Sequence, residues 1–265
     1  MTRKCRTIEA FEYQWRHLPV GVGLLSDPRF RDDVERILWQ EELCLERGWF
    51  ETKRVLDVGC GNGRWTAGFL GLGCDVTAVD AAPSACEAVR ERFGSRVEVL
   101  QADILDPASL QGREFDVVFA WGVLHHTGDA RRALANCCAL AARDGFVYVY
   151  MYGRGSLSRR TRLRLAAIRW LLGPLPPDMK RRVLAWRFRG GTLHNAFDVY
   201  APSINDRFAE TQVRAWFAAE GFSVRRTIEH TELFLEAWRE GAAVDGAFLE
   251  PPRPPYWFQR LTAKS

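Results

Sequence analysis

Residues 55–66 have the sequence Val55-Leu56-Asp57-Val58-Gly59-Cys60-Gly61-Asn62-Gly63-Arg64-Trp65-Thr66. The apolar start predicts a buried strand, the three alternating glycines predict a sharp turn, and the residues from Arg64 onward predict a helix. Because glycine has no Cβ, the backbone of this turn can lie close to a ligand. Asp57 stands inside the apolar run, where a carboxylate is costly unless it has a partner. The simplest partner is the ammonium group of a ligand, reached directly or through water.

A dinucleotide is the first ligand to consider, since its binding turn has the pattern G-x-G-x-x-G. Counted from Gly59, the pattern requires a glycine at position 64, and counted from Gly61 it requires one at position 66. Arg64 and Thr66 occupy these positions. The carboxylate of Asp57 would also repel a pyrophosphate. A dinucleotide oxidoreductase is therefore the least favoured reading, and a glycine turn without any ligand is also less favoured.

The rest of the chain alternates predicted strands and helices, a pattern typical of an α/β protein with a doubly wound, mostly parallel sheet. The predicted strands are 54–59, 75–80, 97–102, 115–120 and 146–152, and the helices between them are 64–72, 83–93 and 130–142. A helix at 210–220 and strands at 222–227 and 233–238 complete the expected core. The proline-rich stretch 250–258 predicts an extended arm.

The glycine turn resembles the first motif of the class I S-adenosylmethionine (SAM) methyltransferases. The strand at 115–120, followed by Leu124-His125-His126 and a turn, is similar to the family's fourth motif. The resemblance covers residues 53–152 closely and extends more weakly to Gly221. It implies a Rossmann-like fold, SAM as cofactor with S-adenosylhomocysteine as its product, and methyl transfer as the activity. One departure is Arg143-Asp144-Gly145, where many relatives have Pro-Gly-Gly, in a predicted surface turn.

Acidic residues at the ends of successive strands agree with this cofactor. Ligands of open α/β sheets bind at the carboxyl ends of the strands. The resemblance implies that Asp57 serves the methionine amine, Asp80 the ribose hydroxyls and Asp103 the adenine amino group. Trp121 follows the fourth strand and would line the cofactor site beside the methionine part of SAM. The expected cofactor-binding residues are Asp57, Gly59, Cys60, Gly61, Gly63, Asp80, Ala81, Ala102, Asp103, Ile104, Ala120 and Trp121.

His125 and His126 are the candidate catalytic residues. A histidine titrates near neutral pH and can take the proton from an oxygen or nitrogen nucleophile as it attacks the methyl group. The alternative is a structural pair, with one ring packed under the sheet and the other capping the helix near Asp129. Methyl transfer by proximity alone needs no base.

The residues that bind the substrate are expected in segments outside the sheet. The stretch Tyr13-Gln14-Trp15-Arg16-His17 would form a lid over the cofactor, or else pack its aromatic side chains on the core. His194 and Asp198, four residues apart, would share a helix face and line the substrate pocket. A metal is not expected, because this pair lacks a third ligand. The expected substrate-binding residues are Tyr13, Trp15, His17, Tyr152, Arg154, His194, Asp198 and Tyr200.

Residues 151–193 form a basic insertion that predicts two arginine-rich helices. They contain eleven Lys or Arg side chains and one acid, Asp178, a net charge of +10, whereas the whole chain carries +4. An anionic small molecule, an acidic carrier protein with a tethered substrate, or RNA would suit this charge. RNA is less favoured, because aromatic platforms or an appended binding domain would be expected. The alternative is a solvated helical cap in which five apolar side chains pack inward while the arginines face water, namely Leu163, Leu165, Ile168, Leu171 and Leu172.

Composition narrows the remaining classes. Seven scattered cysteines without a C-x-x-C pair fit a reducing cytoplasm and argue against a disulfide framework or a zinc site. No apolar run reaches the length of a membrane span, so no membrane partner is expected, and the N-terminus lacks a signal-peptide core. We expect a helical lid at 1–51, a SAM-binding core at 52–152, the insertion at 153–193 and completion of the core at 194–265.

The sequence as a whole predicts a cytoplasmic, SAM-dependent methyltransferase. The expected acceptor is an oxygen or nitrogen on a small molecule, such as a specialised metabolite or a sugar, with anionic and carrier-tethered molecules included. An RNA methyltransferase and a SAM-binding protein that transfers no methyl group are the alternatives.

Overall fold

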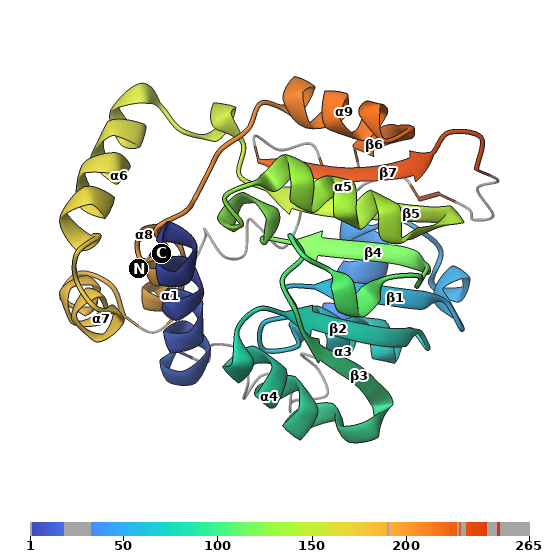
Figure 1. Cartoon of the computed structure of the whole chain (residues 1–265), viewed down its shortest axis with the longest axis horizontal. Helices are drawn as coiled ribbons and strands as arrows, with labels where there is room; N and C mark the ends of the chain where they lie inside the picture. The colour runs from blue at the N-terminus through green and yellow to red at the C-terminus, as the bar shows by residue number, and fades with distance from the viewer. Residues whose placement is uncertain are drawn as a thin grey trace.

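The computed structural model describes residues 2–18, 33–189, 191–226, 228, 232–242 and 248–249. They form a seven-stranded sheet in the order β3-β2-β1-β4-β5-β7-β6. Strands β1 to β5 run parallel, whereas β7 pairs antiparallel with both β5 and β6. The predicted α/β class with a doubly wound, mostly parallel sheet is confirmed (Figure 1). The predicted arm at 250–258 lies outside the described residues.

The elements follow the predicted alternation closely. The strands are β1 Arg54–Val58, β2 Asp75–Asp80, β3 Val97–Gln101, β4 Phe115–Trp121, β5 Ala141–Met151, β6 Phe222–Arg226 and β7 Leu233–Arg239. The helices are α1 Arg3–His17, α3 Arg64–Gly71, α4 Pro83–Phe93, α5 Ala130–Leu140, α6 Arg159–Leu172, α7 Pro177–Ala185, α8 Gly191–Tyr200 and α9 Glu210–Ala219. A π-helix spans Ile37–Glu42, and a 3-10 helix spans Leu124–His126.

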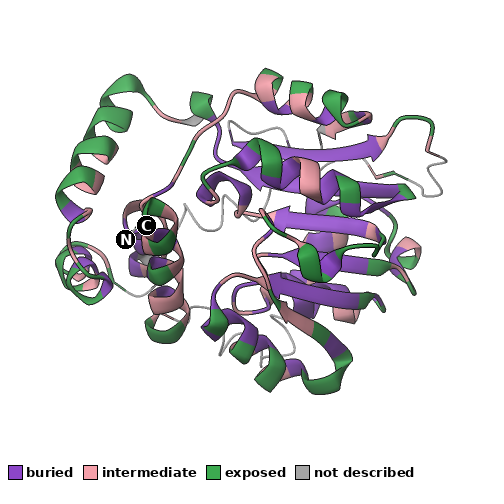
Figure 2. Cartoon of the chain, viewed as in Figure 1, coloured by how far each residue is buried: buried purple, intermediate pink, exposed green. Residues whose placement is uncertain are grey.

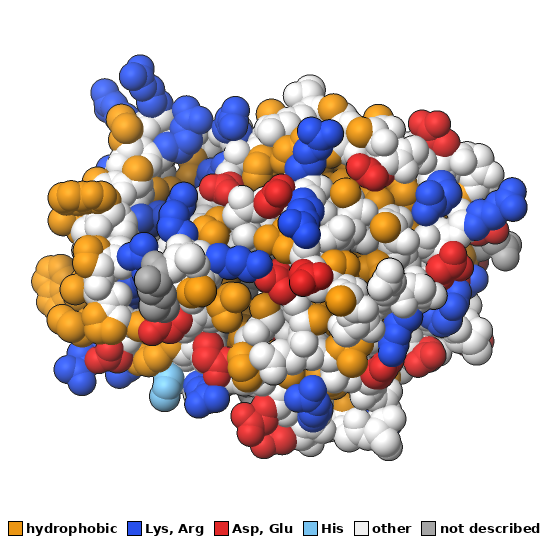
Figure 3. Space-filling view, in the orientation of Figure 1, with side chains coloured by type: hydrophobic (Ala, Val, Ile, Leu, Met, Phe, Trp, Pro, Cys, Tyr) orange, Lys and Arg blue, Asp and Glu red, His pale blue; other side chains and the backbone are white. Residues whose placement is uncertain are grey.

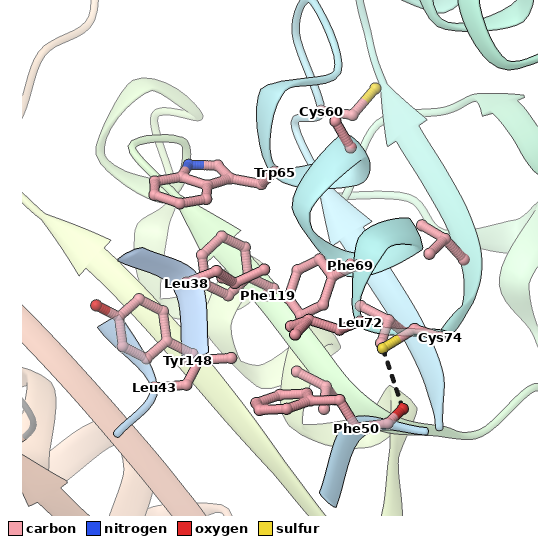
Figure 4. Packing of buried hydrophobic residues seen from close by; sticks show 14 of the residues in the cluster. Leu38, Leu43, Phe50, Cys60, Trp65, Phe69, Leu72, Cys74, Phe119 and Tyr148 are labelled. Atoms are coloured by element: carbon pink, nitrogen blue, oxygen red, sulfur yellow. Dashed lines mark hydrogen bonds between the residues drawn. The ribbon is translucent and has the colours of Figure 1, made fainter. Parts of the chain in front are cut away.

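Helices cover both faces of the sheet because its buried strands carry apolar side chains on both sides. Successive residues face opposite ways, so Val117 belongs to one hydrophobic cluster and Val118 to the other. The first cluster packs under α3, α4 and residues 33–50, and the second under α5 and α9. Figure 4 shows the first cluster, where the Cys74 thiol donates to the Phe50 carbonyl oxygen over 3.3 Å.

Strand β5 begins earlier than the sequence predicted. It starts at Ala141, directly after α5, and its pairing with β4 shifts register between Phe115 and Val117. Gly145 lies at this irregularity, and a Cβ there would stand 2.8 Å from the carbonyl oxygens of Phe115 and Asp116. The expected surface turn at 143–145 is therefore wrong. These residues belong to the strand, where the close approach of two backbones requires glycine.

A third, smaller cluster joins α1 to the helices of the insertion. Ala10 of α1 packs with Leu172 of α6, Leu184 of α7 and Phe197 of α8. These four helices form a module beside the carboxyl ends of the parallel strands, and α6 and α7 lie on its outer edge (Figure 1). No helix within the described ranges is long and apolar enough to cross a membrane.

This module corrects two predicted boundaries. The division between residues 193 and 194 falls inside α8, which packs with the insertion. Residues 1–51 do not form one lid, because only α1 joins the module. Val34, Leu38 and Phe50 lie in the core under the sheet. A sequence pattern shows that such segments have an apolar face, but it does not show which surface that face covers.

Glu236 of β7 leads to a stability prediction. Its side chain is fully buried, accepts a hydrogen bond from Trp238 Nε1 over 2.8 Å, and has a pKa raised to about 7, chiefly by burial. The folded state thus holds a proton that the unfolded state has released, so this group's contribution to stability falls as pH rises through about 4.5 to 7. Between pH 5 and pH 8, Glu236→Gln should gain about 2–3 kcal/mol of unfolding free energy relative to wild type.

Urea unfolding at both pH values measures this difference. Glu91→Gln, at an exposed position on α4, removes the same charge and should show no such trend. A Glu236→Gln curve parallel to wild type at every pH would contradict the prediction.

Candidate functional site

The glycine turn joins β1 to α3 at the point where the strand order reverses, because β1 lies between β2 and β4. Gly59, Gly61 and Gly63 have φ values of 68°, 53° and 80°, a region that favours glycine. A Cβ on Gly59 would lie 2.2 Å from Val123, and one on Gly61 would lie 2.7 Å from Trp15. Side chains from the loop after β4 and from α1 therefore already close over the turn.

Asp57 has a partner within the protein. It is 1% exposed, and its Oδ2 accepts a 2.6 Å hydrogen bond from the Thr66 hydroxyl at the start of α3. Burial raises the pKa of its carboxyl to about 6. We expected a ligand ammonium group to be the simplest partner of Asp57. The Thr66 hydroxyl is instead the partner of its Oδ2. Because the hydroxyl comes from the helix that follows the turn, the bond fixes the turn between strand and helix.

Asp80 ties the turn to the end of β2. Its Oδ2 accepts from the backbone N–H of Gly61 over 3.0 Å, and its Oδ1 accepts from that of Ala82 over 2.8 Å. Burial raises the pKa of this carboxyl to about 6. Each oxygen keeps a second lone pair, so the half-buried carboxylate can also accept hydroxyl groups. The neighbouring Ala81 is half-buried, and Ala102 N donates to the Asp80 carbonyl oxygen.

Asp103 follows β3 and pairs with the lid helix. Its Oδ2 forms an ion pair with Lys4 of α1, and its Oδ1 accepts from Leu105 N over 2.9 Å. The next residue, Ile104, is buried, and its carbonyl oxygen accepts from Asn136 Nδ2. Cys60 and Ala120 are also buried. The ends of β1, β2, β3 and β4 thus bring the predicted cofactor residues to one edge of the sheet.

Helix α1 lies across this edge. In addition to the Lys4 ion pair, its Glu12 carboxylate accepts from the backbone N–H and the hydroxyl of Ser84, at the start of α4. Trp15 packs against the glycine turn. The lid expected around Trp15 therefore has a structural counterpart in α1.

Two other lid residues face away from the turn. The Tyr13 hydroxyl accepts from Arg181 Nε over 2.9 Å, and its ring stacks on Phe197 of α8. His17 is exposed and lies beside Tyr13. Residues 13 and 15 are two apart in a helix and so project to nearly opposite sides. The structure therefore separates Tyr13 and His17 from the cofactor edge and directs them toward the insertion.

Arg64 and Glu42 were not among the expected site residues. The Arg64 guanidinium lies 4.6 Å from the ring centroids of both Trp65 and Trp121. Burial lowers the pKa of Arg64, and the carboxylates of Glu42 and Asp57 act on it in the opposite direction. Glu42 is buried, accepts from Trp121 Nε1 over 3.1 Å and from the Tyr148 hydroxyl, and has a pKa raised to about 7 by burial. Only the position of Arg64 directly after the glycine turn could have indicated it.

The two histidines lie at the carboxyl end of β4, both buried and in contact at 4.1 Å between ring centroids. His126 Nδ1 lies 2.8 Å from the Ile204 carbonyl oxygen, so Nδ1 carries the proton and Nε2 is left as a lone pair. Nε2 has no partner among the described residues, and neither does either nitrogen of His125. Burial lowers the pKa of both rings, that of His125 most.

These contacts contradict the structural alternative in one respect. Helix α5 is capped by Asp129, whose Oδ1 accepts from Arg132 N, so neither histidine caps it. An unpaired buried polar atom costs on the order of 1–3 kcal/mol. Three such nitrogens side by side indicate a place where a ligand or water binds.

Tyr152 and Asp198 join the histidines. The His125 ring stacks on that of Tyr152 with centroids 4.0 Å apart, and the Tyr152 hydroxyl donates to Asp198 Oδ2 over 2.8 Å. Burial beside the Asp198 carboxylate holds the pKa of Tyr152 well above its usual value, so the phenol stays protonated. Phe11 of α1 meets the His126 ring edge-on at 4.9 Å. Strand β5, helix α8 and the lid thus meet at the histidine pair.

Three further expected substrate residues lie elsewhere. His194 binds the Leu18 carbonyl oxygen and the Gln14 side chain, and so holds the end of α1 to α8 rather than sharing a ligand with Asp198. Tyr200 packs toward Phe188, and the side chain of Arg154 is exposed. Among the described residues, no cluster of three His, Cys, Asp or Glu side chains could hold a metal ion. The expected substrate set is therefore split between the histidine pair, the turn and the helical module.

Comparisons with known proteins agree with this geometry. Residues 55–145 match the family model described as a methyltransferase domain. The ubiquinone biosynthesis O-methyltransferase of Bordetella avium is 30% identical over 126 residues, covering 46% of this chain and 51% of that protein. The mitochondrial counterpart of Schizosaccharomyces pombe is 30% identical over 137 residues, 49% of each chain. The chain thus spans about half the length of the curated relatives it matches.

Two solved structures share the fold. The magnesium protoporphyrin IX methyltransferase of Synechocystis PCC 6803 with bound SAM has a TM-score of 0.55 and 16% identity, covering 91% of this chain and 98% of that chain. An O-methyltransferase family protein from Burkholderia thailandensis has a TM-score of 0.55 and 16% identity, covering 88% of this chain and 63% of that chain.

Proposed function

We propose that the chain is a class I SAM-dependent methyltransferase that transfers a methyl group from SAM to an oxygen of a small, flat acceptor molecule. The observation that carries the acceptor side is the pair of buried histidines beside the cofactor edge, three of whose ring nitrogens have no hydrogen-bond partner among the described residues. The two relatives described above are ubiquinone biosynthesis O-methyltransferases, which supports an oxygen acceptor. A nitrogen acceptor remains the alternative atom.

The residues at the carboxyl edge of the sheet fit SAM. Asp80 has free lone pairs for the ribose hydroxyls, and Asp103 lies one strand further along for the adenine. Trp121 and the Arg64 guanidinium stand at the opposite end, where Arg64 would bind the methionine carboxylate. Asp57 would act on the amine through its second oxygen. The guanidinium of Arg64 suits a carboxylate. A dinucleotide-binding turn would instead require glycine at this position.

SAM supplies an electrophilic methyl group on a good leaving group, so the chain must chiefly align the acceptor and exclude water. Helix α1 covers the edge, and the rings of His125, Tyr152 and Phe11 would hold a flat acceptor. His126 Nε2 is the proton acceptor in this proposal. The Ile204 carbonyl fixes its tautomer, and the lowered pKa keeps it unprotonated at neutral pH.

The enclosed arrangement favours a small molecule over RNA. Several basic residues of the insertion act within the protein, since Lys180 Nζ donates to the Ala201 carbonyl oxygen and Arg169 donates to those of Val199 and Pro202. Some of the basic side chains that suggested an anionic partner therefore hold the module together instead. The identity of the acceptor as a specialised metabolite, a sugar or a carrier-tethered molecule, and the cytoplasmic location, stay predictions.

Binding and turnover test the proposal separately. Calorimetric titration should show SAM binding with no measurable affinity for NAD. Incubation with SAM and a panel of small phenols and catechols should release S-adenosylhomocysteine, detected by mass spectrometry together with the methylated acceptor. SAM binding without S-adenosylhomocysteine from any phenol, amine or RNA would favour a SAM-binding protein without transfer. NAD binding tighter than SAM would overturn the assignment of the cofactor.

A further inference from the structure

The outer faces of α6 and α7 expose large apolar side chains. Leu163, Trp170 and Leu171 of α6 are 63%, 78% and 64% exposed, and Met179, Val183 and Trp186 on and just after α7 are 45%, 51% and 89% exposed. Of the large hydrophobic side chains exposed among the described residues, only Phe248 lies elsewhere. We call these six side chains, together with the exposed Arg162, Arg164, Arg182 and Arg187, the α6–α7 surface. Figure 2 shows how exposed this edge of the molecule is.

The apolar side chains form one stripe along each helix. Leu163 and Trp170 are seven residues apart, about two helical turns, and so project to the same side. Met179, Val183 and Trp186 follow the spacing of three and four residues that also selects one side. The opposite faces pack inward through Leu172 and Leu184. In the alternative of a solvated cap, five apolar side chains of α6 would pack inward. Leu172 does so, but Leu163 and Leu171 are exposed, because α6 covers α8 with its other face.

Basic side chains flank each stripe. Arg162 and Arg164, on either side of Leu163 in sequence, project to its two flanks and are exposed. Arg182 and Arg187 stand in the same relation to the α7 stripe and are exposed as well. Figure 3 shows apolar side chains beside Lys and Arg side chains along this edge. An apolar stripe with Trp and Leu at its centre and arginines at its margins is typical of helices that lie in a membrane interface.

From this arrangement we propose that the α6–α7 surface binds the face of an anionic lipid bilayer, with the stripes in the acyl boundary and the arginines among the headgroups. The charges decide between occupants. A second copy of this chain would bring two strongly basic surfaces together. An acidic protein would need the cations gathered opposite its own acids, whereas here they are spread along both helices, as a uniform anionic plane requires. We expected no membrane partner because no apolar run is long enough to span a membrane. That reasoning does not apply to binding at the surface of a bilayer.

Vesicle co-sedimentation tests the proposal on the full chain. The protein should bind vesicles containing phosphatidylglycerol and bind vesicles of phosphatidylcholine alone about tenfold or more weakly. Salt should weaken the binding, and the tryptophan emission should shift to shorter wavelength on binding. Replacing Trp170 and Trp186 together with alanine should weaken binding about tenfold or more, because both side chains leave the interface.

Matched variants separate this surface from charge in general. Arg162→Glu with Arg164→Glu should abolish binding to anionic vesicles. Arg131→Glu with Arg132→Glu, on exposed positions of α5, makes the same change in net charge and should leave binding nearly intact. All four positions are exposed and none is among the residues proposed to bind SAM, so an unchanged SAM affinity reports that the fold is intact.

Three results would overturn the proposal: equal binding to neutral and anionic vesicles, equal loss from the α5 pair, or no binding at low salt. A dimer, or a complex with an acidic carrier protein, that is lost in the Trp170→Ala, Trp186→Ala variant without any vesicle binding would assign the surface to a protein instead. The proposed methyl transfer is measured in solution without vesicles, so either proposal can fail alone.

Discussion

Replacing His126 with asparagine should lower kcat for methyl transfer about 10²- to 10⁴-fold, the usual contribution of a general base, and change SAM affinity by less than about twofold. Asparagine places a side-chain N–H near the position of Nδ1, so the bond to the Ile204 carbonyl oxygen can persist. Nε2, the only ring nitrogen of His126 with a lone pair, is lost. The substitution thus removes the base and keeps its anchor.

The pH profile distinguishes a base from a packing residue. Burial lowers the pKa of His126, so wild-type kcat at saturating SAM should fall only below pH 6.5, as the ring becomes protonated and its lone pair is lost. The asparagine variant should lack this acid limb. His125→Asn is the neighbouring comparison, because it removes a buried ring that has no anchoring hydrogen bond among the described residues. If His126→Asn turns over as wild type does, proximity alone suffices and the base is wrongly assigned.

Replacing Asp80 with alanine should weaken SAM binding tenfold or more, since hydrogen bonds to a charged group contribute about 1.5–3 kcal/mol. Two effects act together. The variant loses the acceptor proposed for the ribose, and it loses the bonds from Gly61 N and Ala82 N that hold the turn. Calorimetry on protein with a wild-type circular dichroism spectrum measures the change.

A comparison with Asp116 controls for the loss of a carboxylate that binds backbone. Asp116 also accepts a backbone N–H, that of Arg54, but at the amino ends of β4 and β1, so Asp116→Ala should leave SAM affinity unchanged. Since the pKa of Asp80 is raised to about 6, wild-type SAM affinity should fall below that pH as the carboxylate gains a proton. Unchanged affinity in Asp80→Ala would mean that the ribose lies elsewhere.

Much of the cofactor edge could be predicted from the sequence because its residues are consecutive or follow strands. Asp57, Gly59, Gly61 and Gly63 belong to a single turn, and parallel pairing alone brings Asp80 and Asp103 to the same edge. The alternation of strands and helices along the chain suffices to predict that parallel pairing. The sequence did not show that side chains of the protein itself contact this edge. Thr66 donates to Asp57, Lys4 pairs with Asp103, and Trp15 packs against the glycine turn.

The acceptor side could not be predicted in the same way, since its members come from distant segments. Tyr152 and Asp198 were expected and do meet the histidines, but Tyr13, His17, Arg154, His194 and Tyr200 do not. The Ile204 carbonyl, which fixes the tautomer of His126, is a backbone atom and leaves no signature in a sequence. Phe11 reaches the same ring only because α1 crosses the strand ends.

The sequence by itself determined the sheet and the turn, because these depend on periodicity and on glycines at fixed spacing within short segments. The tertiary structure alone decided the direction in which each helix of the module faces. Leu163, Trp170 and Leu171 look like core residues in the sequence, yet they are exposed, because α6 buries its other face against α8. Apolar side chains at helical spacing define a face, and only packing decides whether protein, solvent or another surface covers it.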